Sequence, residues 1–249
     1  YADGSRGLAY LSISEMAKHL RQAVALGVRT SFHVIGDAAL ADYLGAVEAV
    51  VSEVGAAAFS GGSHQVEHAV TANAEQLTRL YELDIAWSAQ PRFDATWGAA
   101  GGMYEQRLGR SRSSTLHQFG TASEIGVSLV FGSDSPVTRY DPWGAIFAAC
   151  TPASSAPGMG MRAAFAAHSA SAYRRLRRDE SSGLSVGAPA TFAVWQVETM
   201  EVPASQKLSS WSTDPRSRVR PLPTAGSKPR CLLTVRAGKL LYDSGEIEC

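Results

Sequence analysis

The stretch "SFHVIGDAAL", Ser31 to Leu40, holds a short apolar run with a histidine near its end, followed by Gly36 and Asp37 and then a helical pattern. We predict a strand over Val28–Val34 and a helix that Asp37 caps, because Asp is a preferred helix N-cap and the residues before Gly36 suit a half-buried strand. The stretch therefore predicts one strand–helix unit with His33 near the carboxyl end of the strand.

The same alternation recurs along the chain. Further strands are expected over Ser63–Val70, Ile85–Gln90 and Val127–Phe131. Helices are expected over Glu15–Leu26 after a Ser14 cap, from the Asn73–Gln76 capping box to Asp84, over Thr115–Ile125 and over Met161–Leu176. Strands that alternate with helices are typical of parallel βα units, so the sequence indicates an α/β fold.

The carboxyl-terminal part has another character. Gly183–Trp195 reads as a loop that leads into a strand, residues 203–230 as an irregular segment rich in Ser, Pro and Arg, and Cys231–Arg236 with Lys239–Tyr242 as a closing hairpin. We place a domain boundary between residues 182 and 183.

Composition limits the class of partner. Lys plus Arg and Asp plus Glu number 23 each, so no excess charge indicates nucleic acid or an anionic membrane surface, and we expect a small-molecule partner. The three cysteines are far apart and in no metal-ligand spacing, which favours a reducing compartment. With no predicted membrane span or leader, we expect a cytoplasmic protein.

Three polar residues fall at the carboxyl ends of predicted strands: His33, His68 and Asp134. Each alone has an ordinary explanation, a packed histidine or, for Asp134 in "GSDSP", a turn residue. Their coincidence at one edge, where α/β barrels build active sites, favours a metal site. Two imidazoles and a carboxylate suit a zinc-like ion.

Five segments carry a family resemblance: "FHVIGDAAL", "VEHAV", "AQPRFDATWG", "FGSDSPV" and "GLSVGAPATFAVW". Together they are similar to the metal-dependent amidohydrolase superfamily, in the amidohydrolase family 3 branch that resembles N-substituted formamide deformylases. The resemblance implies that residues 1–182 form the carboxyl-terminal half of a (β/α)8 TIM-type barrel, with about four parallel strands. It implies that residues 183–249 form part of a small β-sandwich.

The same resemblance implies a hydrolase that cleaves a non-peptide C–N bond, of the amide or formamide type, with one or two divalent ions, zinc above all. By that resemblance His33 and His68 are metal ligands and Asp134 is the catalytic aspartate beside them. A divalent ion lowers the pKa of its water, and a carboxylate can take that proton and pass it to the departing nitrogen.

Several other residues have two interpretations each. Arg92 could bind a substrate carboxylate or stay solvated, while Trp97 and Tyr104, in a long Gly-rich loop, could line the pocket or pack on the barrel rim. Asp37 could orient His33 or serve only as a cap. Glu67 is expected to point away from His68, under the barrel helices, and the role of His117 is open.

The family pattern also includes a His-x-His pair on the first barrel strand, and this chain has none. We therefore expect a fragment that is inactive alone and that pairs with a missing amino-terminal half or with another copy. The alternative is a catalytically incomplete half-barrel with a binding or regulatory role, which could retain no metal.

Overall fold

The computed structural model describes residues 1–178, 183–201, 222–224 and 226–247. It divides into two compact units, Tyr1–Arg177 and Arg178–Cys249. Most of the predicted irregular segment 203–230 lies outside the described residues, as does Cys249.

The first unit is built on a parallel sheet of four short strands in the order β1-β2-β3-β4. These are β1 (Ser31–Val34), β2 (Gln65–His68), β3 (Ala86–Ala89) and β4 (Leu129–Phe131). All four lie inside the predicted ranges, and the predicted fold class, a partial (β/α) barrel with a separate antiparallel sheet, is confirmed. Among the described residues no strand pairs with the outer edge of β1 or β4.

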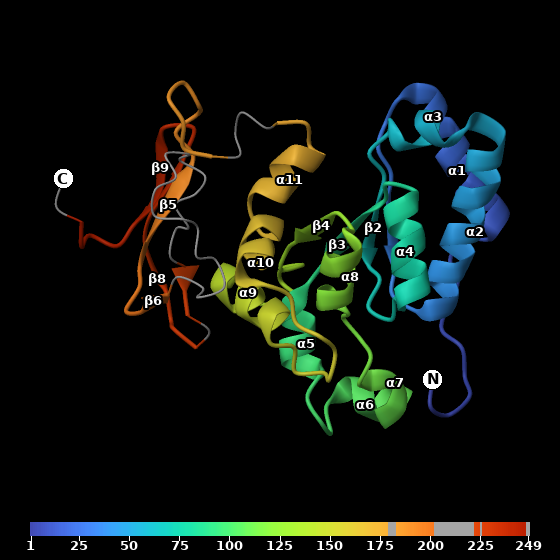
Figure 1. Ribbon diagram of the computed structural model, residues 1–249, viewed down its shortest axis with the longest axis horizontal. Helices are drawn as coiled ribbons and strands as arrows, with labels where there is room; N and C mark the ends of the chain where they lie inside the picture. The colour runs from blue at the N-terminus through green and yellow to red at the C-terminus, as the bar shows by residue number, and fades with distance from the viewer. Residues whose placement is uncertain (179–182, 202–221, 225, 248–249) are drawn as a thin grey trace, which may run out of the picture. The chain divides into compact units, whose positions relative to one another are not determined.

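Helices that precede the strands or connect them lie on one face of the sheet (Figure 1). They are α1 (Ile13–Leu26), α2 (Asp37–Val54), α3 (Ala56–Ser60), α4 (Ala74–Glu82) and α8 (Phe119–Ile125). The capping box of Asn73 with Gln76 is confirmed. Ser12, not Ser14, caps α1, because Ser12 exchanges hydrogen bonds with Glu15 at the third helical position.

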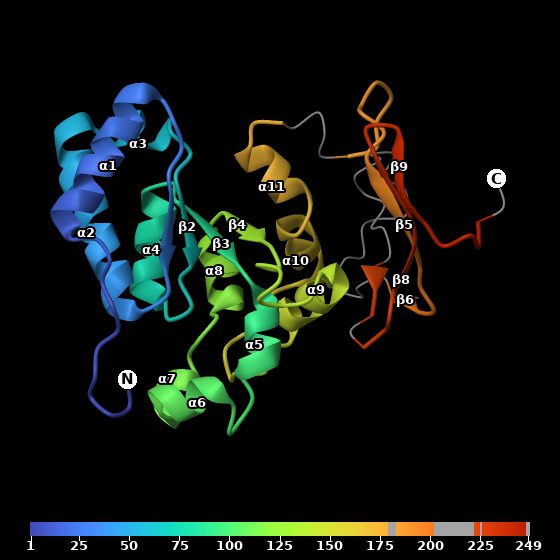
Figure 2. The same ribbon diagram turned by 180° about the vertical axis from the view of Figure 1, so that it is seen from behind.

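The segment after β3 corrects the prediction of a long loop. It forms three short helices, α5 (Pro91–Trp97), α6 (Met103–Leu108) and α7 (Arg110–Ser113). Pro91 at the start of α5 has a backbone suited to the first turn of a helix. Figures 1 and 2 place α6 and α7 beyond the carboxyl ends of the strands, and α3 and α11 at the amino ends.

The segment after β4 differs in two ways from the prediction. An additional helix, α9 (Pro142–Cys150), begins where Asp141 accepts a hydrogen bond from the Gly144 amide. Its buried residues lie all around it, so it lacks the one-sided apolar pattern that makes a helix easy to predict. The single helix expected over 161–176 is two, α10 (Met161–Ala167) and α11 (Ala170–Arg175), because the backbone of Ser169 is not helical.

The core of the first unit lies between the sheet and its helices. Val34 and Val66 face this layer, and Phe32 packs against Tyr43 of α2 with ring centroids 5.3 Å apart. The largest fully buried side chains are Trp87, Tyr43, Phe59, Phe119, Leu20 and Leu40. Burial of these rings and branched chains is the dominant stabilising term, about 1.5–3 kcal/mol for each.

The second unit holds an antiparallel sheet of β5 (Phe192–Gln196), β8 (Arg230–Arg236) and β9 (Lys239–Asp243), in the order β5-β8-β9. The predicted hairpin is confirmed as β8 and β9. A separate pair joins β6 (Met200–Glu201) to β7 (Leu222–Pro223).

Among the described residues no helix has the length and apolar character needed to cross a membrane.

Candidate functional site

His33 and His68 meet at the carboxyl ends of β1 and β2. Nε2 of His68 lies 3.0 Å from Nδ1 of His33, and the two rings cross edge to face with centroids 4.5 Å apart. His33 is exposed, whereas His68 is 7% exposed. The structure thus brings two of the three predicted site residues into direct contact.

The backbone of His68 makes this contact possible. In the parallel register Val34 pairs with His68 and His33 pairs with Glu67, so a regular pleat would put the two histidines on opposite faces. His68 instead has a φ of 71°, in the left-handed region, which turns its ring toward His33. A non-glycine residue there costs on the order of 1–3 kcal/mol, and such strain concentrates at functional sites.

Two residues of the third strand segment hold His68. The Gln90 Oε1 atom lies 2.9 Å from His68 Nδ1, and the Trp87 Nε1–H donates to the His68 carbonyl at 2.6 Å. Gln90 and Trp87 are both buried, so neither contact is exchanged with water. Sequence reasoning missed both residues, although the polar Gln90 directly after a buried strand was a usable signal.

Asp134 follows β4, at the same edge. It is exposed and also has a positive φ, 52°. Partial burial and the neighbouring His68 lower the pKa of His33, while the charges of Asp134 and Glu67 act in the opposite direction. The carboxylate of Asp134 therefore lies within electrostatic range of His33.

The histidine pair has a geometry that a metal ion can use. Zinc–nitrogen bonds of about 2.0–2.1 Å in a tetrahedron place two ligand nitrogens about 3.3 Å apart, close to the 3.0 Å seen here. The carbonyl oxygen of Gln90 would keep the proton on His68 Nδ1 and leave Nε2 free to bind. Within the described residues, no three His, Cys, Asp or Glu side chains are grouped to hold an ion.

Glu67 does not take its expected place under the helices. It is half-buried and accepts hydrogen bonds from Ser31 Oγ and Gln65 Nε2, both at 2.6 Å. The register puts Glu67 on the same face as His33, because paired residues of parallel strands point the same way. The expectation was wrong because it assumed that His68 follows the regular pleat, which would turn its neighbour Glu67 toward the helices.

Arg92, a predicted substrate-binding residue, has a protein partner. Its Nη1 lies 3.7 Å from Oδ2 of Asp141, the residue that caps α9, and its side chain is 25% exposed. Neither of the two expected roles includes this contact, which joins the segments after β3 and β4. The Arg92 Nε atom is buried without a hydrogen-bond partner in the described part of the chain.

Trp97 and Tyr104, the other predicted substrate-binding residues, belong to an aromatic series that starts at His68. Phe93 stacks on His68 with centroids 5.9 Å apart, and Trp97 packs between Phe93 and Tyr104 at 4.8 Å and 6.1 Å. Tyr104 is only 8% exposed, which leaves little of its side chain accessible to a ligand. Trp97 is partly buried and remains the better candidate for a pocket wall.

Beyond Tyr104 the series continues into the interior. His117 is 1% exposed, with its ring 5.6 Å from that of Tyr104, and burial lowers its pKa to about 3. Asp94 is fully buried and accepts hydrogen bonds from the amides of Ala153 and Ser154, and burial raises its pKa. These residues support the rim from below.

Asp37 does not cap α2. Gly36 occupies the N-cap position and Asp37 is the first helical residue, where its negative charge suits the positive end of the helix. The Asp37 carboxylate pairs with Arg112 of α7 at 2.7 Å. Asp37 thus joins the start of α2 to the helices beyond β3.

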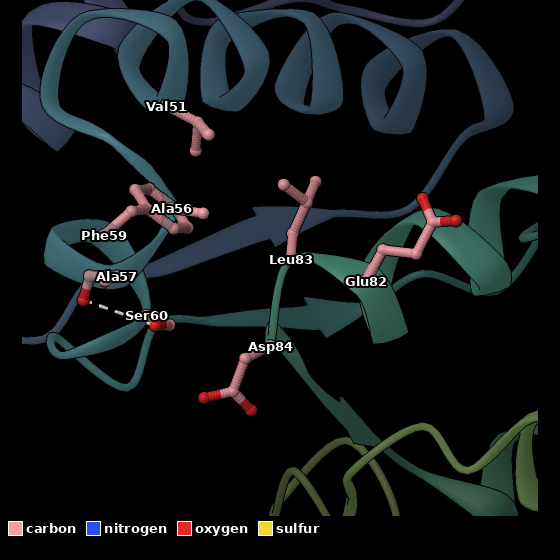
Figure 3. A pocket seen from close by; sticks show the side chains of 8 residues that line it. All are labelled: Val51, Ala56, Ala57, Phe59, Ser60, Glu82, Leu83 and Asp84. Carbon is pink, nitrogen blue, oxygen red and sulfur yellow. Dashed lines mark hydrogen bonds between the residues drawn. The ribbon is translucent and has the colours of Figure 1, made fainter.

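A separate cavity lies away from this site. Residues at the end of α2, in α3 and at the end of α4 line an open cavity of about 160 Å³, among them Phe59, Leu83 and Asp84 (Figure 3). These residues precede β2 and β3, so the cavity lies at the amino ends of the strands. The histidine pair at the carboxyl ends is the better candidate for chemistry.

Known proteins resemble this chain over parts of their length. YtcJ of Bacillus subtilis (strain 168), which bears the name of an amidohydrolase, is 28% identical over 130 residues, 51% of this chain and 22% of its own. An uncharacterized metal-dependent hydrolase from Pyrococcus furiosus superposes with a TM-score of 0.63 at 26% identity, over 75% of this chain and 37% of its own. The chain thus spans well under half of both proteins.

Two more distant structures share the fold. Ochratoxinase of A. niger has a TM-score of 0.59 at 19% identity, over 96% of this chain and 47% of its own. Atrazine chlorohydrolase TrzN from Arthrobacter aurescens TC1, complexed with zinc, has a TM-score of 0.56 at 15% identity, over 95% and 49%.

The model of the family described as "Amidohydrolase family" matches residues 1–242, nearly the whole chain. The matched range includes all four parallel strands and both histidines of the pair. The chain belongs to the amidohydrolase family.

Proposed function

We propose that this chain supplies part of the active site of a metal-dependent hydrolase that cleaves a non-peptide C–N bond. The observation that carries the proposal is the His33–His68 contact at the carboxyl ends of β1 and β2, with the pair oriented by Gln90. A backbone held in the left-handed region to aim a buried imidazole at another is difficult to explain by packing alone.

In this proposal each residue of the site has a separate role. His33 and His68 hold a divalent ion, zinc in the first instance, and Gln90 keeps the proton on His68 Nδ1. When bound, such an ion supplies an activated water and polarises the substrate carbonyl. Asp134 takes the proton of the attacking water and gives it to the departing nitrogen, which would otherwise leave as an unstable amide anion.

The proposed substrate is a small amide, with the N-substituted formamides as the narrower candidate. Support comes from family membership and from the segments that resemble formamide deformylases. Trp97 offers an aromatic wall beside Phe93. Arg92 could meet a substrate carboxylate only in competition with Asp141.

The two open edges of the four-stranded sheet favour a further partner. Four more βα units, or a second copy of this chain, would pair with β1 and β4 and cover the exposed face around His33.

We place the protein in the cytoplasm, where Cys150 and Cys231 would stay reduced as the free thiols seen here. In the alternative, a binding or regulatory half-barrel, the histidines hold no ion.

Zinc titration of the full chain against a chromophoric chelator tests the proposal. We expect His33→Ala and His68→Ala each to weaken zinc binding strongly, because each removes one of two ligands. His19→Ala, on the exposed side of α1, is the matched control and should leave binding unchanged. Equal zinc affinity in the original chain and all three variants would refute the ligand assignment, and absence of zinc binding by the original chain would favour the half-barrel without metal.

A further inference from the structure

A second cavity lies at the end of the sheet opposite the histidine pair. Its volume is about 390 Å³, and it lies at the amino end of β4, between α8 and the two helices α10 and α11. This volume falls within the range of small-molecule sites, roughly 300–1,000 Å³. All of its walls belong to the first unit.

One wall of the cavity is polar and basic. This wall comes from α11 and is formed by Ser171, Arg174 and Arg175. The wall from α10 is apolar, with Ala163, Ala166 and Ala167, and the rest of the lining, from α8 to β4 together with Met159, mixes serines with apolar residues. A ligand that matched both walls would carry a polar head and an apolar body.

The guanidinium groups keep donors that the described protein does not use. Arg175 pairs with Asp84 at 3.2 Å and donates to the His64 carbonyl at 2.9 Å, yet its buried Nε has no partner in the described part of the chain. Arg174 is exposed and donates to the neutral Ser171 Oγ at 2.9 Å, and no carboxylate of the described residues pairs with it. A buried charged donor without an acceptor, such as the Arg175 Nε, is costly, which favours an acceptor supplied from outside.

The charge of Arg175 also acts on a neighbouring group outside the cavity lining. Burial is the main cause of the lowered pKa of His64, and the charges of Arg175 and Arg29 lower it further. Within hydrogen-bonding reach of Arg175, the described residues offer a single carboxylate, Asp84, which is itself half exposed.

We propose that this cavity binds a small organic carboxylate, with its head on Arg174 and Arg175 and its aliphatic body against Ala163 and Ala166. Planar guanidinium groups match a carboxylate with paired hydrogen bonds. The apolar wall distinguishes this ligand from a bare oxyanion such as phosphate. The site is independent of the histidine pair, which lies at the other end of the strands.

Calorimetric titration of the full chain with acetate, butyrate and hexanoate, at constant ionic strength, tests this proposal. Each buried methylene should tighten binding about fourfold, from about 0.8 kcal/mol per CH₂. Inorganic phosphate, which tests the head alone, should bind no better than acetate. No binding of hexanoate, or phosphate binding as tight as hexanoate, would overturn the proposal.

Two variants separate the walls. Arg174→Gln should weaken hexanoate binding about 10-fold or more, as expected for a hydrogen bond to a charged group. Arg178→Gln, which removes the same charge outside the cavity lining, should not. Ala166→Leu fills the apolar side without altering charge and should likewise weaken hexanoate binding, with circular dichroism to show that each variant is folded. Equal weakening by Arg174→Gln and Arg178→Gln would show general charge attraction and contradict the site.

Discussion

Gln90→Leu tests how the histidine pair is held, because it removes the amide oxygen 2.9 Å from His68 Nδ1 while nearly conserving the side-chain volume. Gln90 is 5% exposed and His68 is 7% exposed, so water cannot easily replace the lost acceptor. A buried donor left without a partner costs about 1–3 kcal/mol. We expect the free energy of unfolding to fall by about 2 kcal/mol.

The same change should affect metal binding separately from stability. Without Gln90 the proton of His68 is no longer held on Nδ1, and Nε2 is free for an ion only part of the time. Residues that orient metal ligands in this way typically contribute about 10- to 100-fold in metal affinity. We therefore expect zinc affinity to fall by about that factor, and Gln90→Glu, which keeps an acceptor at the same place, to retain most of it.

Urea denaturation followed by tryptophan fluorescence measures the first effect, and competition with a chromophoric chelator the second. Gln22→Leu, the same substitution at an exposed position of α1, is the matched control. If Gln90→Leu matched Gln22→Leu in both unfolding free energy and zinc affinity, the Gln90–His68 contact would have no role in holding the site.

Three further predictions follow from the rim and the residues beneath it. In a preparation with measurable amide hydrolysis, Asp134→Asn should lower turnover about 100-fold or more and leave zinc content unchanged, and normal turnover would remove Asp134 from the mechanism. Burial lowers the pKa of His117 from 6.5 to about 3, so the unfolded chain binds a proton there more readily than the folded chain does. The free energy of unfolding should therefore be unaffected by this group above pH 6.5 and should fall as the pH decreases toward 3. His117→Phe should reduce that loss of stability, while the exposed His19→Phe should not. Asp94→Asn should lower the free energy of unfolding by about 1–3 kcal/mol in urea titration, because the buried side chain of residue 94 can then accept from only one of the amides of Ala153 and Ser154; an unchanged midpoint would contradict this.

Burial determines which of the predicted aromatic substrate-binding residues remains accessible to a ligand. Trp97 retains partial exposure beside Phe93, whereas Tyr104 packs with Val70 and Leu116 in a hydrophobic cluster. Burial, and the nearby charge of Asp94, raise the pKa of Tyr104, so its phenol stays protonated throughout the physiological range. An aromatic residue in a Gly-rich stretch can take either place, and only the packing of α5 and α6 distinguishes them.

The order of the four parallel strands, and of the helices beside the first three, was determined by the sequence itself. Apolar runs of strand length, the capping box at Asn73 and Gln76, and the Ala237–Gly238 turn act over a few neighbouring residues, so local patterns were enough to locate β1 to β4, α4 and the closing hairpin. The placement of His33, His68 and Asp134 at one edge also followed, because parallel strands bring their carboxyl ends together.

Only the tertiary structure decided how these residues face one another. The left-handed backbone of His68 reverses the face that the pleat would assign, and its partners Gln90 and Trp87 come from a strand about twenty residues further along. The helix α9 and the pairing of Arg92 with Asp141 likewise depend on contacts between separate segments. The periodicity of a sequence depends only on residues that are close together in one segment of the chain. A site is made by side chains from several strands, and their contacts and backbone strain exist only after the strands have paired.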